Sequence, residues 1–447
     1  MVGQRHIRSV LTAFMLVLPV LVLVSVVFAI ARDIPFWDDF EAAFKFLCLN
    51  TPDKLRHLLD FHNEHRIAIP RMIYWAITAI HGQIDFRTAI MCGDCLLIAY
   101  LVLLGRQFAK HVGAVVFIPF IWLFTDMANY ENFLWSLTSM QSQGVMLFVL
   151  ASLLLFERRD RSICLAGSLA SAAAASLTSA SGIIVWPCLV GMAVKDWLVE
   201  DGRYAWGRFA DSTSLKSLFS PGNSMAFIAC AIFLVLYFQG FSNHPGAEVD
   251  HSAEIAAYPH PILAAIDFFV TFCGAIVPHR AVALPLGIVV LALIAYIVVN
   301  SARIKQTGIL FLLAYTIGVD FSGAVMRSCM GGARAALFYR YEIVTITMAA
   351  SVFFCMTVLW RDRAQVLWKW LLRMAIVLAV LANIAIFTLG FPLLLERDKL
   401  LHDGIYAWPE DITKLRCGNP QRDSTFLKMA VDAGIYTPPR PMTDGHP

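Results

Sequence analysis

The chain has 447 residues, of which 59% are hydrophobic and only 15% are charged, and its formal net charge is +3. Soluble domains carry about 25% charged residues, so this composition excludes an ordinary soluble enzyme. It predicts an all-α protein that crosses a membrane many times. The small net charge is dispersed without a basic block, so we expect no nucleic-acid partner.

Apolar runs predict about eleven transmembrane helices, because each has few charges and a length near the roughly 20 residues that span a bilayer. Lys and Arg recur in every second loop, which places the N-terminus in the cytoplasm by the positive-inside rule. A further apolar stretch, 263–278, would invert the later loops if it crossed, so we expect it to be re-entrant or interfacial. The predicted spans are 10–30, 86–104, 112–126, 142–156, 162–178, 182–198, 225–241, 283–300, 308–325, 342–360 and 370–394.

This topology divides the chain into a transmembrane domain, 1–394, and a short extracytoplasmic tail, 395–447. The first outer loop, 32–85, belongs to the transmembrane domain. The tail contains "DSTFLKMAVDAGIY", whose pattern predicts a short amphipathic helix. The other outer segments lie around 127–141, at 242–262 and at 326–341, and most of the notable polar residues are on this outer side.

Two adjacent acids, Asp38 and Asp39, follow the first span in "IPFWDDF". The apolar residues after them have helical spacing, which predicts a helix lying in the membrane interface. An Asp at this position can cap the start of such a helix, or it can act as a general base. A helix cap accounts for one acid and not for the second. The sequence leaves open which of the two acids would cap the helix and which would act as the base.

The same loop continues with "HNEHR", which places His62, Glu64, His65 and Arg66 within five positions. Arg suits phosphate because its planar fork offers two parallel donors. His and Glu can bind a cation or transfer protons. A helix would put His62 and His65 on one side, three residues apart. The alternative is a solvated loop, but so many functional groups between two apolar runs favour a binding site.

The second outer loop, "NYENFLWSLTSMQSQG", sets Glu131, Asn132, Gln141 and Gln143 among aromatic residues. Amides and carboxylates beside aromatic rings suit a sugar, because its hydroxyls take hydrogen bonds and its ring face packs on an aromatic. The alternative is an aromatic belt at the bilayer surface, which does not explain the two glutamines.

A third outer segment, "MRSCMGGARAALFYRYEIV", contains Arg334, Arg340 and Tyr341. Outer loops are normally poor in Arg, so these arginines predict either binding of a lipid-linked phosphate or snorkelling from helix ends.

In order along the chain from Trp37 to Tyr341, "WDDF", "HNEHR", "ENFLW" and "YRYE" resemble the recurring motifs of a large bacterial group within the GT-C glycosyltransferase superfamily. Ser136 and Leu137 stand where the family's second motif has Gly and Phe, and Tyr339 stands where a Ser is usual. The resemblance implies a GT-C-like fold in the bacterial inner membrane, with the site on the extracytoplasmic face.

The resemblance also implies the chemistry. The enzyme would transfer a sugar from a polyprenyl-phosphate donor to a glycan or lipid acceptor, with inversion and Asp38 or Asp39 as general base. Arg66, Arg334 or Arg340 would stabilise the departing lipid phosphate. A divalent cation, Mg or Mn, is possible, with His62, Glu64 and His65 as potential ligands.

Two other functions stay open from the residues. A transporter or flippase of lipid-linked glycans would place ionisable residues along a path through the bilayer, often with internal repeats. A non-catalytic subunit of an envelope assembly complex would tolerate substitution of the outer polar residues.

Overall fold

The computed structural model describes residues 2–200, 203–205, 218–241, 260–328, 332–360 and 365–439. Of the predicted outer loop 242–262, residues 242–259 lie outside this description, as does the end of the predicted tail, 440–447.

Within the described ranges, nine helices are long and apolar enough to cross a membrane, so the protein is a multi-pass α-helical membrane protein. They coincide with nine of the eleven predicted spans. These helices are α1 (Val2–Ile30), α4 (Phe86–His111), α7 (Ser136–Phe156), α9 (Val185–Leu198, extended by η4, Ala180–Ile184), α11 (Pro221–Phe238), α14 (Arg280–Val299), α15 (Thr307–Arg327), α16 (Glu342–Trp360) and α17 (Gln365–Ala407).

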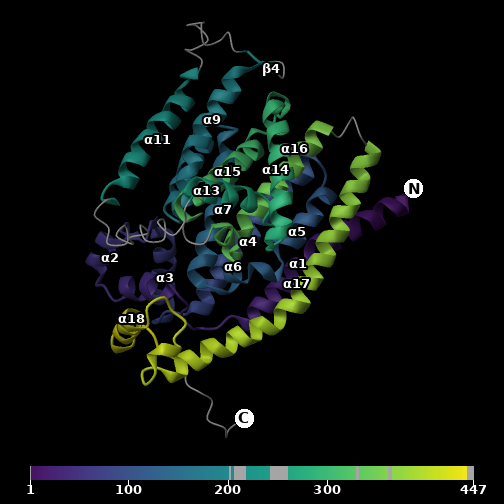
Figure 1. Ribbon diagram of the computed structural model, residues 1–447. Coiled ribbons are helices and arrows are strands. Elements are labelled where there is room, and N and C mark those ends of the chain that lie inside the picture. The colour runs from purple at the N-terminus through teal and green to yellow at the C-terminus, as the bar shows by residue number, and fades with distance from the viewer. Residues whose placement is uncertain are drawn as a thin grey trace.

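The other two predicted spans are shorter apolar helices, so the count of eleven crossings is not confirmed. One is formed by η2 (Ala114–Phe117) with α5 (Ile118–Phe124), and the other is α8 (Ser162–Ser176). The stretch predicted to be re-entrant contains α13 (Pro261–Cys273), which is also short. It packs beside α14 and α15 near the ends that face the first loop (Figure 1).

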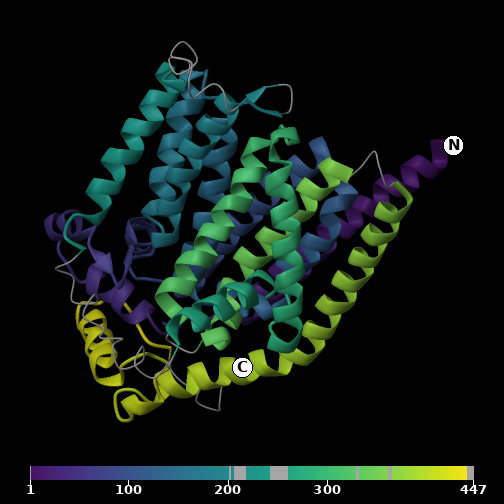
Figure 2. The ribbon, with the colours of Figure 1, turned by 45° about the horizontal axis from the view of Figure 1, so that its top comes forward.

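The helix ends gather at two ends of the bundle, which we call the N-terminal end and the first-loop end (Figures 1 and 2). At the N-terminal end, Glu157 after α7 accepts a hydrogen bond from the Gly308 amide of α15 at 2.7 Å. There Lys195 of α9 also donates to the Ile304 carbonyl at 3.0 Å. At the first-loop end, the Leu177 carbonyl after α8 accepts from the Ile69 amide, so α8 runs between the two ends.

The first loop folds as separate short elements rather than as one interfacial helix. A single π-helical turn, η1 (Phe40–Lys45), buries Phe40 and Phe44. The chain then breaks at Asn50, whose side chain caps the next helix by accepting from the Asp53 amide. The elements that follow are α2 (Thr51–His57), β1 (Phe61–His62), β2 (His65–Arg66) and α3 (Ala68–His81).

Two hydrophobic cores stabilise the molecule. The larger core fills the helix bundle. The smaller core joins the first loop to the beginnings of α4 and α7 and to residues 401–436 of the tail. The tail is therefore packed against the first loop. Its amphipathic helix is confirmed as α18 (Pro420–Asp432), which contacts η1 and buries Leu427 and Ala430 on one face.

The remaining described elements are short connections that border the site or the N-terminal end. They are η3 (Met127–Asn129), α6 (Tyr130–Leu134), β3 (Val199–Glu200), β4 (Arg203–Tyr204), η8 (Ser301–Arg303), η10 (Gly332–Leu337), η11 (Tyr339–Tyr341) and η12 (Ile412–Lys414).

Candidate functional site

The two adjacent acids have different surroundings. Asp39 is 1% exposed. Its Oδ1 accepts hydrogen bonds from the Ser136 hydroxyl at 2.7 Å, the Leu137 amide at 3.0 Å and the Tyr74 hydroxyl at 3.0 Å. Its Oδ2 accepts from the Phe36 amide at 3.1 Å. Burial raises the pKa of Asp39 to about 6, although these four donors act in the opposite direction. Asp39 thus ties the first loop to α3 and α7.

Asp38 is half-buried, and no group of the described residues donates a hydrogen bond to its carboxylate. It follows Trp37, a residue that has a positive φ of 49° and is 47% exposed. Such a conformation is unfavourable for a bulky residue and persists only where the surroundings hold it. Here the Trp37 amide donates to the Arg416 carbonyl of the tail at 2.9 Å. The turn directs consecutive carboxylates into different environments.

The "HNEHR" motif forms a tight hairpin instead of a helix. β1 and β2 pair antiparallel, with His62 opposite His65. Asn63 stands at the turn with a φ of 50°, a left-handed conformation that Asn tolerates better than most residues. The expectation that a helix would align the two histidines is therefore wrong; the two-residue strands align them across the hairpin.

The two histidines of the hairpin are bound differently. His65 Nδ1 accepts a hydrogen bond from the Ala180 amide at 3.0 Å, so its proton is on Nε2 when the ring is neutral. That nitrogen lies 3.4 Å from the Glu64 carboxylate. His62 is 4% exposed, and its Nε2 has no hydrogen-bond partner among the described residues. Burial lowers the pKa of both rings, that of His62 to about 4.

The charged residues of this hairpin are held by other elements. Glu64 forms an ion pair with Arg327 at the end of α15, and the charges of His65 and Arg327 lower its pKa to about 2 against the effect of burial. Arg66 donates to the carbonyls of Tyr237 at 2.8 Å and Gln239 at 2.6 Å, and its guanidinium also binds the Leu59 carbonyl. Arg66 therefore fastens the hairpin to the end of α11.

The second-loop residues fall into two groups. Asn132 and Gln143 are fully buried. Gln143 Nε2 donates to the Asn132 carbonyl at 2.6 Å and to Asp94 of α4 at 3.3 Å, so it braces α6 against α4 and α7. Gln141 and Glu131 are partly exposed. The Nε2 of Gln141 has no partner among the described residues.

Arg340 connects the motifs. Burial raises the pKa of Asp38 and of Glu131, and for each of them Arg340 is the strongest opposing charge. Arg340 also contributes to the lowered pKa of His65, after burial and the charge of Arg327, whereas Glu64 acts in the opposite direction. The backbone supports this position, because the Arg340 carbonyl accepts from Asn132 Nδ2 at 3.4 Å. The charge of Arg340 therefore acts on titratable groups from three motifs that are separated in sequence.

The N–H groups of the Arg340 guanidinium donate no hydrogen bond to any described residue. Its Cζ lies 5.5 Å from the ring centroids of both Phe338 and Tyr341, and among the described residues it forms no ion pair. Arg334 is exposed and likewise forms no ion pair with any described carboxylate. These two arginines can thus offer planar donors to an anion.

Three charged residues that the sequence analysis did not single out border the site. Arg397 of α17 lies over the Phe36 ring at 4.6 Å and donates to the Leu134 carbonyl at 3.1 Å, joining the first and second loops. Arg422 of α18 pairs with Glu41 at 3.2 Å. Arg397 follows an apolar span on the predicted outer side, so the charge rule that drew attention to Arg334 could have found it. Arg422 and Glu41 carry no such signal.

Two buried carboxylates lie beneath these residues. Asp126 is 1% exposed and accepts from the Ala128 amide at 3.0 Å. Glu342, directly after Tyr341, is 4% exposed, and its carboxylate oxygens have no hydrogen-bond partner among the described residues.

The resemblance leaves a divalent cation open, with His62, Glu64 and His65 as potential ligands. In the described part of the chain, no three His, Cys, Asp or Glu residues lie together in a way that could hold a metal ion. Whether the protein uses Mg or Mn therefore stays open.

Comparison of the chain with protein-family models and with curated proteins gives no match.

Proposed function

We propose that this protein is a membrane glycosyltransferase that moves a sugar from a polyprenyl-phosphate donor to an envelope glycan or lipid acceptor. The influence of the Arg340 charge on Asp38, Glu131 and His65, together with the absence of any hydrogen-bond donor to Asp38 among the described residues, supports this proposal most strongly. The site combines an uncommitted carboxylate, an uncommitted guanidinium and sugar-compatible polar groups at one end of a membrane-embedded bundle.

Asp38 is the general base in this proposal. It deprotonates the acceptor hydroxyl, whose oxygen then attacks the anomeric carbon of the donor. The bond from that carbon to the phosphate oxygen breaks, and the polyprenyl phosphate leaves with the bonding electrons, so the anomeric centre inverts. Arg340, helped by Arg334, stabilises the negative charge on the departing phosphate. Because phosphate is already a good leaving group, no general acid is needed.

The other site residues have supporting roles in this scheme. Asp39 is bound by four donors, so it positions the loop that carries Asp38. Glu131 and Gln141 are the partly exposed polar side chains of the second loop and suit sugar hydroxyls. His62, with its unpartnered Nε2, is a further candidate for an acceptor hydroxyl or a cation. Arg66 stabilises the hairpin.

We further propose that the first-loop end faces the extracytoplasmic side of the bacterial inner membrane, with the N-terminus in the cytoplasm. Basic residues support this orientation: Lys110, Arg158 and Lys195 all lie at the N-terminal end. The tail, which packs on the first loop, is then extracytoplasmic too.

The deciding experiment incubates purified protein with a panel of polyprenyl-phosphate sugars and acceptor fractions, and follows release of polyprenyl phosphate and formation of a glycosidic bond. We expect donor consumption that Asp38→Asn abolishes. Movement of a labelled lipid-linked sugar across proteoliposomes without a new glycosidic bond would instead establish the transporter.

A further inference from the structure

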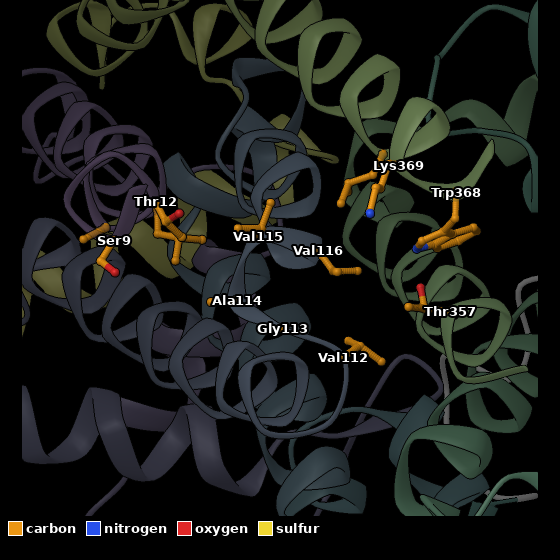
Figure 3. A pocket seen from close by; sticks show the side chains of 13 residues that line it. Ser9, Thr12, Val112, Gly113, Ala114, Val115, Val116, Thr357, Trp368 and Lys369 are labelled. Atoms are coloured by element: carbon orange, nitrogen blue, oxygen red, sulfur yellow. The ribbon is translucent and has the colours of Figure 1, made fainter. Parts of the chain in front are cut away.

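A groove with a volume of about 850 Å³ lies at the N-terminal end of the bundle, between the first half of α1 and the beginning of α17 (Figure 3). Its size falls within the roughly 300–1,000 Å³ of ligand cavities. Figure 3 shows Ser9 and Thr12 on one side and Trp368 and Lys369 on the other. The lining residues are Ser9, Thr12, Ala13, Leu16, Val112, Gly113, Ala114, Val115, Val116, Thr357, Trp368, Lys369 and Leu372.

The groove exists because α1 and α17 are tied together at one end and at their middles, but not at the other end. Arg32 and Asp398 pair at 2.9 Å at the first-loop end. Midway, Asn383 of α17 donates to the Trp122 carbonyl at 2.6 Å, and Trp122 Nε1 donates to the Met15 carbonyl of α1 at 2.9 Å. Beyond this level the two helices leave the space that the groove occupies.

The walls of the groove continue into surfaces that face the membrane. On α1, Val10 and Phe14 are more than half exposed, and on α17 the same is true of Val366 and Leu367. Large apolar side chains with this exposure on membrane-crossing helices contact lipid. An occupant that enters between these helices therefore comes from the bilayer and brings an apolar chain.

One rim of the groove is basic and is bordered by tryptophans. Lys369 lines the groove, and Arg373, one turn further along α17, lies over the Trp370 ring at 5.6 Å. Trp360, Trp368 and Trp370 gather at this end, as tryptophans do at headgroup level. None of the described residues that line the groove is acidic. The rim thus favours a negatively charged headgroup over a zwitterionic one.

We propose that this groove binds one anionic phospholipid, with an acyl chain between α1 and α17 and the phosphate beside Lys369. The site lies at the opposite end of the bundle from Asp38, so this inference is independent of the proposed function. The bound lipid fills the space between α1 and α17 at this end, while Trp368 of α17 packs against Phe353 of α16.

The test uses the full chain in nanodiscs made from equal amounts of phosphatidylglycerol and phosphatidylcholine. After transfer to detergent, native mass spectrometry counts the phospholipids that stay bound. We expect one retained lipid, mostly phosphatidylglycerol. Lys369→Gln should reduce the preference for phosphatidylglycerol by about fivefold, the effect of one surface charge on an anionic lipid. Lys399→Gln, an exposed lysine near the other end of α17, is the matched control.

Filling the groove tests the position of the chain. Ala13→Trp places an indole in the groove and should abolish lipid retention, whereas Val10→Trp, on the exposed side of α1, should not. Leu372→Trp on the opposite wall gives a second test if the first variant does not fold. Equal retention in the filled and control variants would overturn the site, and equal retention of the two lipids by the wild type would overturn its preference for anions.

Discussion

The contrast between Asp38 and Asp39 gives a prediction in which stability and activity separate. Replacing either acid with Asn changes the side chain by one atom and removes its charge. If the surroundings decide the role, Asp39→Asn will reduce stability and Asp38→Asn will reduce sugar transfer.

The hydrogen bonds of Asp39 set the expected magnitude. An Asn at this position can keep its oxygen at the Oδ1 position, where Ser136, Leu137 and Tyr74 donate. Its amide nitrogen then faces the Phe36 amide, which is also a donor. Leaving a buried donor unpaired costs about 1–3 kcal/mol, so Asp39→Asn should lower the free energy of unfolding by about that amount. Asp39→Ala leaves two backbone donors unpaired and should cost about 2–6 kcal/mol.

Asp38 accepts no hydrogen bond from the described residues, so Asp38→Asn should change the free energy of unfolding by less than about 0.5 kcal/mol. Loss of a general base should lower kcat by about 10²–10⁴-fold. Tryptophan fluorescence during unfolding in detergent and polyprenyl phosphate release provide the two readouts. This reasoning would be refuted if both Asn variants were destabilised equally. It would also be refuted if Asp39→Asn kept wild-type stability but lost activity while Asp38→Asn stayed active.

Three further predictions follow from single contacts. Removing the Arg340 charge raises the pKa of Asp38, so Arg340→Gln should move the acidic limb of the pH profile of kcat/KM to higher pH. Arg340→Lys keeps the charge and should largely restore the wild-type profile. An acidic limb that does not move in Arg340→Gln would exclude Asp38 as the titrating base. Burial lowers the pKa of His62 from its ordinary value of 6.5 to about 4, so the free energy of unfolding should fall by up to about 3 kcal/mol as the pH falls from 6.5 to 4. In unfolding curves measured across this range, His62→Gln should reduce the pH dependence. His57→Gln, at an exposed histidine, should not reduce it. A Cβ on Gly93 would lie 2.2 Å from Ser139 Oγ, so Gly93→Ala should lower the unfolding free energy by about 1–3 kcal/mol, whereas Gly390→Ala, with no neighbour nearer than 4.0 Å, should be nearly neutral.

The membrane-crossing helices could be predicted because each depends on a local property. An apolar run of sufficient length determines a span by itself, whatever it packs against. The basic residues at one end of these runs likewise follow from composition. Length alone left the segments 112–126 and 162–178 undecided, because their helices are shorter than a usual span.

The polar motifs could be found in the sequence, but their roles could not. Arg66 has the chemistry of a phosphate ligand, yet it is held by the carbonyls of Tyr237 and Gln239, some 170 positions away in the chain. Gln143 looked like a sugar ligand and instead braces buried helices through Asp94. Hydrogen bonds between distant residues determine such roles, and no local pattern encodes them.

The sequence by itself therefore determined a multi-pass helical membrane protein whose notable acids, histidines and arginines gather in a few segments between the spans. Only the tertiary structure decided which of these residues meet. It buried Asp39 among four donors, left Asp38 uncommitted, brought Arg340 to the motifs of the first and second loops, and packed the tail with Arg422 onto the first loop. The physical reason is that hydropathy and helix length act along the chain, whereas burial, charge pairing and hydrogen-bond satisfaction depend on neighbours that folding supplies.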